Sequence, residues 1–236
     1  MPQYFIPAEN IRAGEFFAGP EESNHIARAA RARAGDEIEI FDGKGGRYRA
    51  VVKNVAGDRV SGTVGEKLPS PEYRTRLTLC FAVVARPALE DILEHCTEAG
   101  VGVFQPVMSS RVQFDLFSDW ERRAGRLNQI VLSAAKQCGR GVLPQVRKPE
   151  KLDDLLARGG PAVFAAADGL PADEAAKALA GAGEIKLFVG PEGGFTRGET
   201  DFARSGGAVF MNLGLYTLRA ESACLAASSA LLTRLG

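Results

Sequence analysis

The sequence predicts a small β-barrel domain followed by an α/β domain with a mostly parallel sheet. Short strand-like runs separated by turn residues occupy the chain between Gln3 and Lys67, which is typical of a small barrel. Two prolines within Leu68-Pro69-Ser70-Pro71-Glu72 then favour extended backbone and interrupt the pattern. Beyond them strands and helices alternate, as in a parallel sheet covered on both faces. We therefore expect one domain over residues 1–70 and a second over residues 71–236.

In the first domain, alternating apolar residues and turn signals indicate four strands and one helix. The expected strands are Tyr4–Pro7, Glu37–Asp42, Tyr48–Asn54 and Val60–Val64. Between the first two, Glu21–Arg33 is predicted to be a helix, with Ser23 as its candidate N-cap residue.

In the second domain, apolar runs that could be buried strands alternate with helical stripes. The expected strands are Leu77–Ala85, Val101–Val107, Ala162–Ala167, Ile185–Val189 and Ala208–Leu213. The expected helices are Pro87–Gly100, Ser118–Gly139, Pro171–Leu179, Arg197–Ser205 and Arg219–Leu235. Ligands of such sheets bind beyond the carboxyl ends of the strands, so the loops that follow the strands are the candidate site.

Composition excludes several classes of protein. Lys plus Arg and Asp plus Glu both total 29, so the net charge does not favour nucleic acid, and an RNA surface would require local clustering. Cys80, Cys96, Cys138 and Cys224 are widely spaced, and with two histidines in the chain we expect buried reduced thiols and no metal site. No apolar run is long enough to span a membrane, and the chain starts without a basic segment before an apolar one. We expect a cytoplasmic protein.

Two loops near the C-terminus carry the strongest functional signal. Val189-Gly190-Pro191-Glu192-Gly193-Gly194 follows one expected strand, and Leu213-Gly214-Leu215-Tyr216-Thr217-Leu218 follows another. The glycines let the backbone approach a ligand closely, while Pro191 stiffens the turn, which suits a flat uncharged ligand. A phosphate cradle is the competing interpretation, but neither nucleotide-binding glycine pattern is present and Glu192 would repel phosphate. A purely structural glycine turn is the other alternative.

The two stretches, F-V-G-P-E-G-G-F-T-R-G-E and L-G-L-Y-T-L-R-A-E-S-A, resemble the paired signature motifs of the RsmE family, the 16S rRNA uracil-N3 methyltransferases of the SPOUT class. The second motif differs from the usual L-G-P-R-I-L-R-T-E-T-A at Leu215, Tyr216, Thr217, Ala220 and Ser222. The N-terminal region resembles the family's PUA-like domain at His25-Ile26, Arg31, Gly35-Asp36 and Phe41-Asp42-Gly43, although Gln3 stands where the family usually has Arg. Pro106 to Arg111 resembles P-x-x-S-E-R with Ser110 for Glu, and Ala134 to Arg140 resembles A-x-E-Q-S-G-R.

The resemblance implies a PUA-like β-barrel that binds RNA and a SPOUT-type trefoil-knot domain that binds S-adenosylmethionine. It also implies a homodimer in which the second subunit completes each site, with 16S rRNA or the small ribosomal subunit as substrate. The cofactor-binding residues that it implies are Ala166, Val189, Gly190, Pro191, Glu192, Gly193, Gly194, Leu213, Gly214, Leu215, Thr217 and Leu218. The candidate RNA-binding residues are Arg28, Arg31, Arg111, Lys136, Gln137 and Arg140. A solvated charged surface and a basic helix end are the structural alternatives for the latter group.

Methylation of uracil N3 requires loss of its proton and alignment of the nitrogen with the methyl group. Arg219 is the candidate for stabilising the charge that develops on the carbonyl oxygens. Glu221 is the candidate for removing the proton, with Glu98 as a second carboxylate to consider. Alternatively, Arg219 and Glu221 simply open the last helix. Three other functions remain open: another RNA methyltransferase of this fold acting on a ribose 2′-oxygen or a different base, a noncatalytic RNA-binding assembly protein, and a nucleotide-hydrolysing enzyme.

Overall fold

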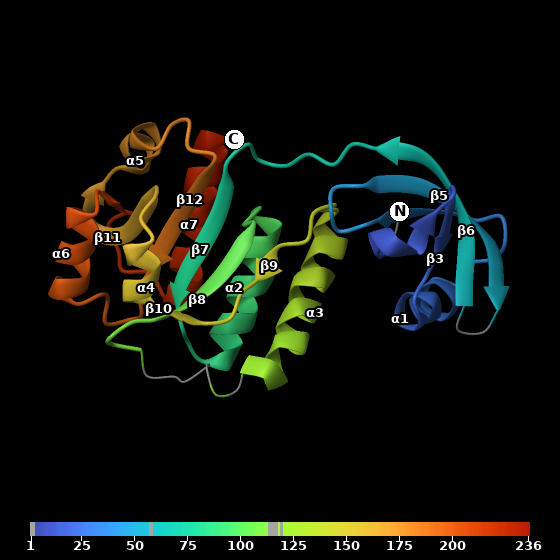
Figure 1. Cartoon of the computed structure of the whole chain (residues 1–236), viewed down its shortest axis with the longest axis horizontal. Coiled ribbons are helices and arrows are strands. Elements are labelled where there is room, and N and C mark those ends of the chain that lie inside the picture. The colour runs from blue at the N-terminus through green and yellow to red at the C-terminus, as the bar shows by residue number, and fades with distance from the viewer. Residues whose placement is uncertain (1–2, 57–58, 113–117, 119) are drawn as a thin grey trace. The chain divides into compact units, whose positions relative to one another are not determined.

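The computed structural model describes residues 3–56, 59–112, 118 and 120–236. The chain forms two compact units (Figure 1). The first contains the residues up to Glu72 together with Ala135–Leu143, and the second contains Tyr73–Ala134 and Pro144–Gly236. A short segment from the middle of the chain therefore belongs to the same unit as the N-terminal residues.

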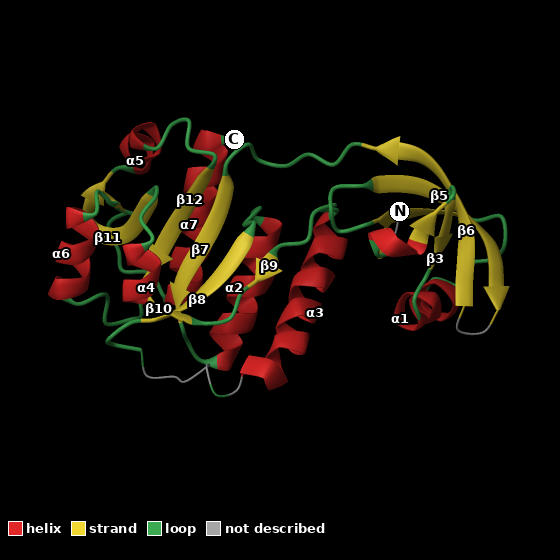
Figure 2. Cartoon of the chain, viewed as in Figure 1, coloured by secondary structure: helices red, strands yellow, loops and turns green. Residues whose placement is uncertain are grey.

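The first unit is built on a curled six-stranded sheet (Figure 2). Its strands are β1 (Gln3–Phe5), β2 (Ile11–Arg12), β3 (Glu15–Phe17), β4 (Glu37–Phe41), β5 (Arg47–Ala56) and β6 (Arg59–Leu68), in the order β1-β4-β5-β6-β3-β2. β1 runs parallel to β4, and the other pairs are antiparallel. One face of the sheet is apolar because alternate residues such as Ile38 and Ile40 on β4, and Ala50 and Val52 on β5, point into the core.

The helical segment of the first unit differs from the expected single helix. A 3-10 turn (Ala8–Asn10) precedes β2, α1 spans Pro20–Asn24, and a π-helical turn follows over His25–Ala29. The helix begins at Pro20 after Gly19, so the prediction of Ser23 as N-cap was wrong. The buried Ser23 hydroxyl instead accepts a hydrogen bond from Val60 N at 2.9 Å and donates one to Ala18 O at 3.1 Å, which ties the helix to β6.

The second unit is a seven-stranded, wholly parallel sheet with helices around it. Its strands are β7 (Arg76–Ala82), β8 (Val103–Met108), β9 (Gln145–Val146), β10 (Glu150–Lys151), β11 (Ala162–Leu170), β12 (Glu184–Val189) and β13 (Val209–Met211). The order is β10-β8-β7-β12-β11-β13, and β9 also pairs with β8. The helices are α2 (Arg86–Glu98), α3 (Trp120–Cys138), α4 (Leu152–Ala157), α5 (Ala172–Ala178), α6 (Arg197–Ser205) and α7 (Ala220–Leu235). The last residues of α3, from Ala135 on, belong to the first unit. Of the expected helix Ser118–Gly139, Asp119 lies outside the described residues.

Helices cover both faces of the parallel sheet, as the alternation of its buried residues shows. Leu79 of β7 and Leu187 of β12 belong to the larger core cluster, which also contains residues of α2, α3, α5 and α7. Their neighbours Cys80 and Phe188 belong to a second cluster, with residues of α4 and α6. Because successive side chains of a strand point to opposite faces, the two clusters lie on opposite sides of the sheet.

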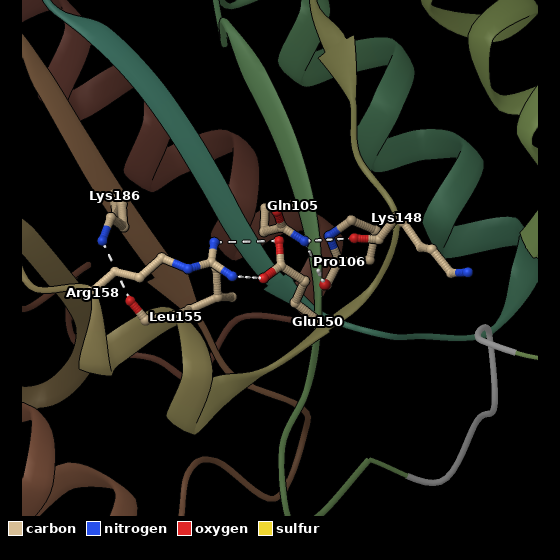
Figure 3. Close-up of polar contacts among 7 residues, drawn as sticks. All are labelled: Gln105, Pro106, Lys148, Glu150, Leu155, Arg158 and Lys186. Carbon is tan, nitrogen blue, oxygen red and sulfur yellow. Dashed lines mark hydrogen bonds and ion pairs between the residues drawn. The ribbon is translucent and has the colours of Figure 1, made fainter.

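A buried glutamine holds one edge of the sheet together (Figure 3). Gln105 of β8 is fully buried, and its Nε2 donates to Lys148 O at 2.8 Å and to Pro106 O at 3.2 Å. Arg158 pairs with Glu150 of β10, and Lys186 Nζ donates to Leu155 O at 3.3 Å. These bonds fix β9, β10 and α4, which are too short to be predicted from periodicity.

The cysteines are free thiols. Cys80, Cys96 and Cys224 are buried, and burial raises the pKa of the Cys96 thiol to about 12. The prediction that all four are buried was wrong for Cys138, which is exposed because it ends α3. Among the described residues, each helix is too short or too polar to span a lipid bilayer.

Candidate functional site

The two glycine-containing loops meet around one cavity of about 380 Å³. The cavity lies at the carboxyl ends of β11, β12 and β13, where a parallel sheet places its ligands. Eleven of the predicted cofactor residues line it: Ala166, Val189, Gly190, Pro191, Glu192, Gly194, Leu213, Gly214, Leu215, Thr217 and Leu218. The remaining one, Gly193, faces a neighbouring cavity. A volume of this order suits a ligand the size of a nucleoside.

The first loop needs glycine at two positions for different reasons. Gly194 has φ +68°, a left-handed conformation that side chains disfavour, and its N–H donates to Pro191 O at 2.7 Å to close the turn. Gly190 has an ordinary φ, but a Cβ there would lie 3.1 Å from the ring of Phe195. A side chain at Gly190 would therefore require the Phe195 ring to move by a few tenths of an ångström.

Two polar side chains, those of Arg111 and Glu199, hold the first loop in place through hydrogen bonds. Arg111, in the loop after β8, donates through Nη1 to Gly193 O and, at 3.5 Å, to Phe195 O. Glu199 of α6 accepts from the backbone N–H groups of Ser110 at 2.8 Å and Thr196 at 2.6 Å, and the Thr196 hydroxyl caps α6. Burial opposes ionisation of Glu199, but these hydrogen bonds outweigh it and hold the pKa of the carboxyl below its usual value.

The second loop is shaped by Asn212. Its side-chain oxygen accepts from Gly214 N at 2.6 Å, which forms an Asx turn, and its Nδ2 donates to Ala167 O. Its backbone N–H donates to Leu170 O at 2.8 Å. The pairing of β11 with β13 breaks after Ala165 and resumes at Leu170, and the intervening stretch brings Ala166 and Ala167 to the cavity. Asn212 thus joins the β11 segment to the second loop.

Aromatic rings form the base of the cavity. Phe164 stacks on Phe188 with ring centroids 4.6 Å apart and on Phe210 at 5.3 Å, and it meets Phe195 edge-on at 5.1 Å. Phe164, Phe195 and Phe210 line the cavity, as do Thr200 and Ala223, and none of these was a predicted site residue. The alternation of residues along the strand predicts that Phe164 is buried, but it does not predict that Phe164 borders a cavity.

A second cavity of about 240 Å³ adjoins the first, since Pro191, Glu192 and Ala220 line both. Glu221 and Arg111 line the second cavity together with Gly193. Arg219 is exposed at the N-cap of α7 and lines neither cavity. Of the two predicted catalytic residues, only the half-buried Glu221 lines a cavity, the second one.

Glu98, the other carboxylate considered, lies at the far end of the sheet. It is the last residue of α2, which follows β7 and leads back to the start of β8. A helix of 13 residues is about 20 Å long, so Glu98 is separated from the carboxyl ends of the strands by roughly that length. This position favours Glu221 over Glu98 for proton removal.

The predicted RNA-binding residues differ in their surroundings. Arg28, Arg31 and Gln137 are exposed in the first unit, and Arg31 has φ +53°. Lys136 Nζ lies 2.6 Å from Glu22 Oε1, within the same unit. Arg140 pairs with both carboxylate oxygens of Glu72, at 3.1 and 2.9 Å, and its side chain is only 8% exposed. In the described part of the chain, no group of His, Cys, Asp and Glu side chains could hold a metal ion.

The chain is similar to known RNA methyltransferases along most of its length. Residues 71–232 match a family described as an RNA methyltransferase domain, and residues 17–64 match an RNA methyltransferase PUA domain. Ribosomal RNA small subunit methyltransferase E of Synechocystis is 31% identical over 85% of this chain and 67% of its own length. The Bacillus subtilis protein of that name is 27% identical over 98% of this chain and 96% of its own length.

Solved structures share the fold. Ribosomal RNA small subunit methyltransferase E from Neisseria gonorrhoeae, bound to S-adenosyl methionine, superposes with a TM-score of 0.84 at 27% identity and covers 99% of this chain and 97% of its own. A methyltransferase from Legionella pneumophila, also with bound cofactor, has a TM-score of 0.86 at 23% identity over 99% of this chain and 97% of its own.

Proposed function

Since this chain belongs to the RsmE family of RNA methyltransferases, we propose that it transfers a methyl group from S-adenosylmethionine to N3 of a uridine in 16S rRNA. The observation that carries the proposal is the cavity that both motif loops form at the carboxyl ends of β11, β12 and β13. In the Neisseria gonorrhoeae relative, which shares the fold over nearly its whole length, the bound molecule is S-adenosyl methionine.

The residues around the cavity fit that cofactor. Loop backbone and small side chains leave room for a nucleoside, and the aromatic base gives its ring an apolar surface. Glu192 is a carboxylate that disfavours a phosphate ligand and favours a cationic one. When bound, S-adenosylmethionine supplies an electrophilic methyl group on a cationic sulfur, so no metal is required for the transfer.

The second cavity is the proposed place for the acceptor uracil. Its shared wall of Pro191, Glu192 and Ala220 puts it beside the cofactor cavity, so the two reactants would be held as neighbours. Such alignment can lower a barrier by about 7–11 kcal/mol. Glu221, which lines this cavity, would accept the N3 proton. Arg219 lines neither cavity but directly precedes Ala220 of the shared wall, and its exposed side chain would turn over the cavity rim to stabilise negative charge on the uracil oxygens. The base must be unpaired to enter, which costs a few kcal/mol.

Three finer features belong to the same proposal. The trefoil knot proposed for the second unit rests on the resemblance of both motif loops to those of the family. An experimental structure in which the chain is not knotted would contradict this.

Leu215 and Tyr216 are 95% and 84% exposed beside the cavity, which supports a homodimer that covers them. The substrate places the protein in the cytoplasm, and detection in another compartment would contradict this.

The reaction is tested with purified small ribosomal subunits and labelled S-adenosylmethionine, followed by mass spectrometry of the digested RNA. We expect N3-methyluridine with the wild-type chain. For Glu221→Gln, and separately for Arg219→Ala, we expect kcat to fall at least tenfold while the cofactor Kd stays within twofold. Methylated ribose or another base would replace the proposed specificity. Calorimetry without cofactor binding would favour a noncatalytic RNA-binding protein, and binding of ATP or GTP instead would favour a nucleotide-hydrolysing enzyme.

A further inference from the structure

A row of stacked planar side chains crosses the parallel sheet at the base of the cofactor cavity. Phe188, Phe164 and Phe210 occupy paired positions on β12, β11 and β13. Neighbouring strands lie about 4.8 Å apart, so their rings stack, with centroids separated by 4.6 and 5.3 Å. β13 is at the end of the strand order, and there Arg204 of α6 continues the row. Its guanidinium carbon lies 3.8 Å from the centroid of the Phe210 ring.

Arg204 also holds a part of β11 that borders the cavity. Residues 166–169 leave the sheet between two positions of β11 that pair with the same residue of β13, and we call them the β11 loop. Ala166 and Ala167 of this loop line the cavity. The next residue is Asp168, whose Oδ2 accepts from Arg204 Nη2 at 2.7 Å. The loop is thereby attached to α6, which lies beside β11 (Figure 1).

Contacts with β13 fix the other side of the β11 loop. Asn212 donates from Nδ2 to Ala167 O and from its backbone N–H to Leu170 O at 2.8 Å. A Cβ at Gly169 would lie 2.5 Å from Met211 N, so the loop returns to the sheet in close contact with the backbone of β13. The β11 loop is therefore held between a strand on one side and the Arg204 side chain on the other.

One side chain thus joins the wall of the cavity to its base. Arg204 and Asp168 do not line the cavity themselves, so they act on it through the β11 loop and the Phe210 ring. Their side chains are 46% and 72% exposed, and ion pairs with such exposure contribute little to the stability of a fold. The effect to expect from this pair is therefore on the shape of the cavity.

We propose that Arg204 and Asp168 are positioning residues for S-adenosylmethionine. The inference rests on the proposed function for the identity of the ligand. With the pair in place, the β11 loop and the Phe210 ring are ordered before the ligand arrives, which lowers the cost of binding. Without it, the ligand has to order both of them, and its affinity falls.

The test compares cofactor binding by the full-length protein and by Arg204→Gln, measured by calorimetry with S-adenosylmethionine. The matched control is Arg234→Gln, because Arg234 of α7 pairs with Asp173 of α5 at nearly the same exposure, 39% and 70%. It lies near the far end of a helix of 16 residues, about 24 Å long, whose first residue lines the cavity. We expect the Kd to rise about fivefold for Arg204→Gln and to stay at the wild-type value for Arg234→Gln.

Further measurements separate positioning from stability. Asp168→Asn should raise the Kd about twofold, because Arg204 keeps its contact with Phe210. The double variant Arg204→Gln, Asp168→Asn should match Arg204→Gln alone, because the two residues act as a unit. Arg204→Lys keeps the charge but cannot stack, so its Kd should be intermediate. For Arg204→Gln, the KM for the cofactor should rise while kcat at saturating cofactor stays within twofold.

Hydrogen exchange provides a measurement that needs no ligand. In the free protein, the amides of residues 166–170 should exchange faster in Arg204→Gln than in the wild type. A wild-type Kd in Arg204→Gln, whatever its Tm or exchange rate, would overturn the positioning role while leaving methylation intact. An equal rise of the Kd in Arg234→Gln would overturn it as well. A higher Kd in Arg204→Gln alone, in a protein that methylates no uridine, would overturn the proposed function and keep the positioning role. A wild-type chain that binds no S-adenosylmethionine would overturn both.

Discussion

The hydrogen bond between Ser110 and Glu199 explains why one departure from the family pattern is tolerated. Ser110 occupies the place of a family Glu, yet the 2.8 Å bond to Glu199 comes from its backbone N–H. Any residue except proline can supply that donor. The departures at Leu215 and Tyr216 are equally compatible with the fold, because both side chains are exposed and pack against no core. We therefore expect these two departures to affect the binding of a ligand or of a partner subunit and not the stability of the fold.

Arg140 and Gln137 are three residues apart, but their replacement should affect the stability of the fold differently. Removing the buried Arg140 guanidinium leaves Glu72 without its bidentate partner, and hydrogen bonds to charged groups contribute about 1.5–3 kcal/mol each. We expect Arg140→Ala to lower the free energy of unfolding by about 2 kcal/mol, measured by urea denaturation. The matched variant Gln137→Ala, on an exposed side chain, should change stability by less than about 0.5 kcal/mol. If Arg140→Ala leaves the stability unchanged but weakens RNA binding, Arg140 acts in RNA binding and not in holding the fold.

Among the elements, those with long apolar periodicity could be predicted and the shortest could not. β7 and β12 are nearly continuous buried runs, and α3 shows a helical stripe, so the parallel sheet followed from the sequence. β2, β9 and β10 have two residues each, which is too few for any period. The π-helical turn after α1 was missed because Glu21–Arg33 has the spacing of an ordinary helix.

The candidate site shows the same division at the level of loops. The glycine loops could be located because backbone freedom is visible in the residue types. The supporting contacts of Arg111, Asn212 and Phe195 could not, because they join segments that lie far apart in the chain. Whether Arg111 contacts RNA stays a prediction, and its bond to the Gly193 carbonyl gives it a role in holding the first loop as well.

The strand-to-helix connection after β12 offers a matched pair of glycines. Gly190→Ala places a methyl group 3.1 Å from the Phe195 ring, which packs on Phe164 under the cavity. We expect the S-adenosylmethionine Kd to rise about tenfold, or 1.4 kcal/mol, in calorimetry. Gly198→Ala, eight residues on in α6, meets open space and should leave the Kd unchanged, with slightly higher stability from helix propensity. Equal Kd values for the two variants would argue against a cavity that depends on Phe195.

At the scale of the whole molecule, the exposed apolar side chains beside the cavity make a prediction about assembly. The chain has a mass of 25.1 kDa, and light scattering should give twice that value if a second copy covers Leu215 and Tyr216. We expect the specific activity to fall on dilution as the dimer dissociates, because the partner is proposed to complete each site. A monomer mass with activity independent of concentration would contradict the shared site.

The return of Ala135–Leu143 to the first unit sets an order of events during synthesis. Gly45 N donates to Gly141 O at 3.1 Å, and Leu143 N donates to Gly43 O at 2.9 Å, so the N-terminal unit includes contacts made only by a later part of the chain. Domains near the N-terminus generally fold first as they leave the ribosome. The core of that unit comes from residues 4–64, but its contacts with Ala135–Leu143 form only after α3 has been translated, by which time β7 and β8 have already been synthesised. A released fragment that ends at residue 72 should therefore be cleaved by protease faster than the same unit is in the full-length chain.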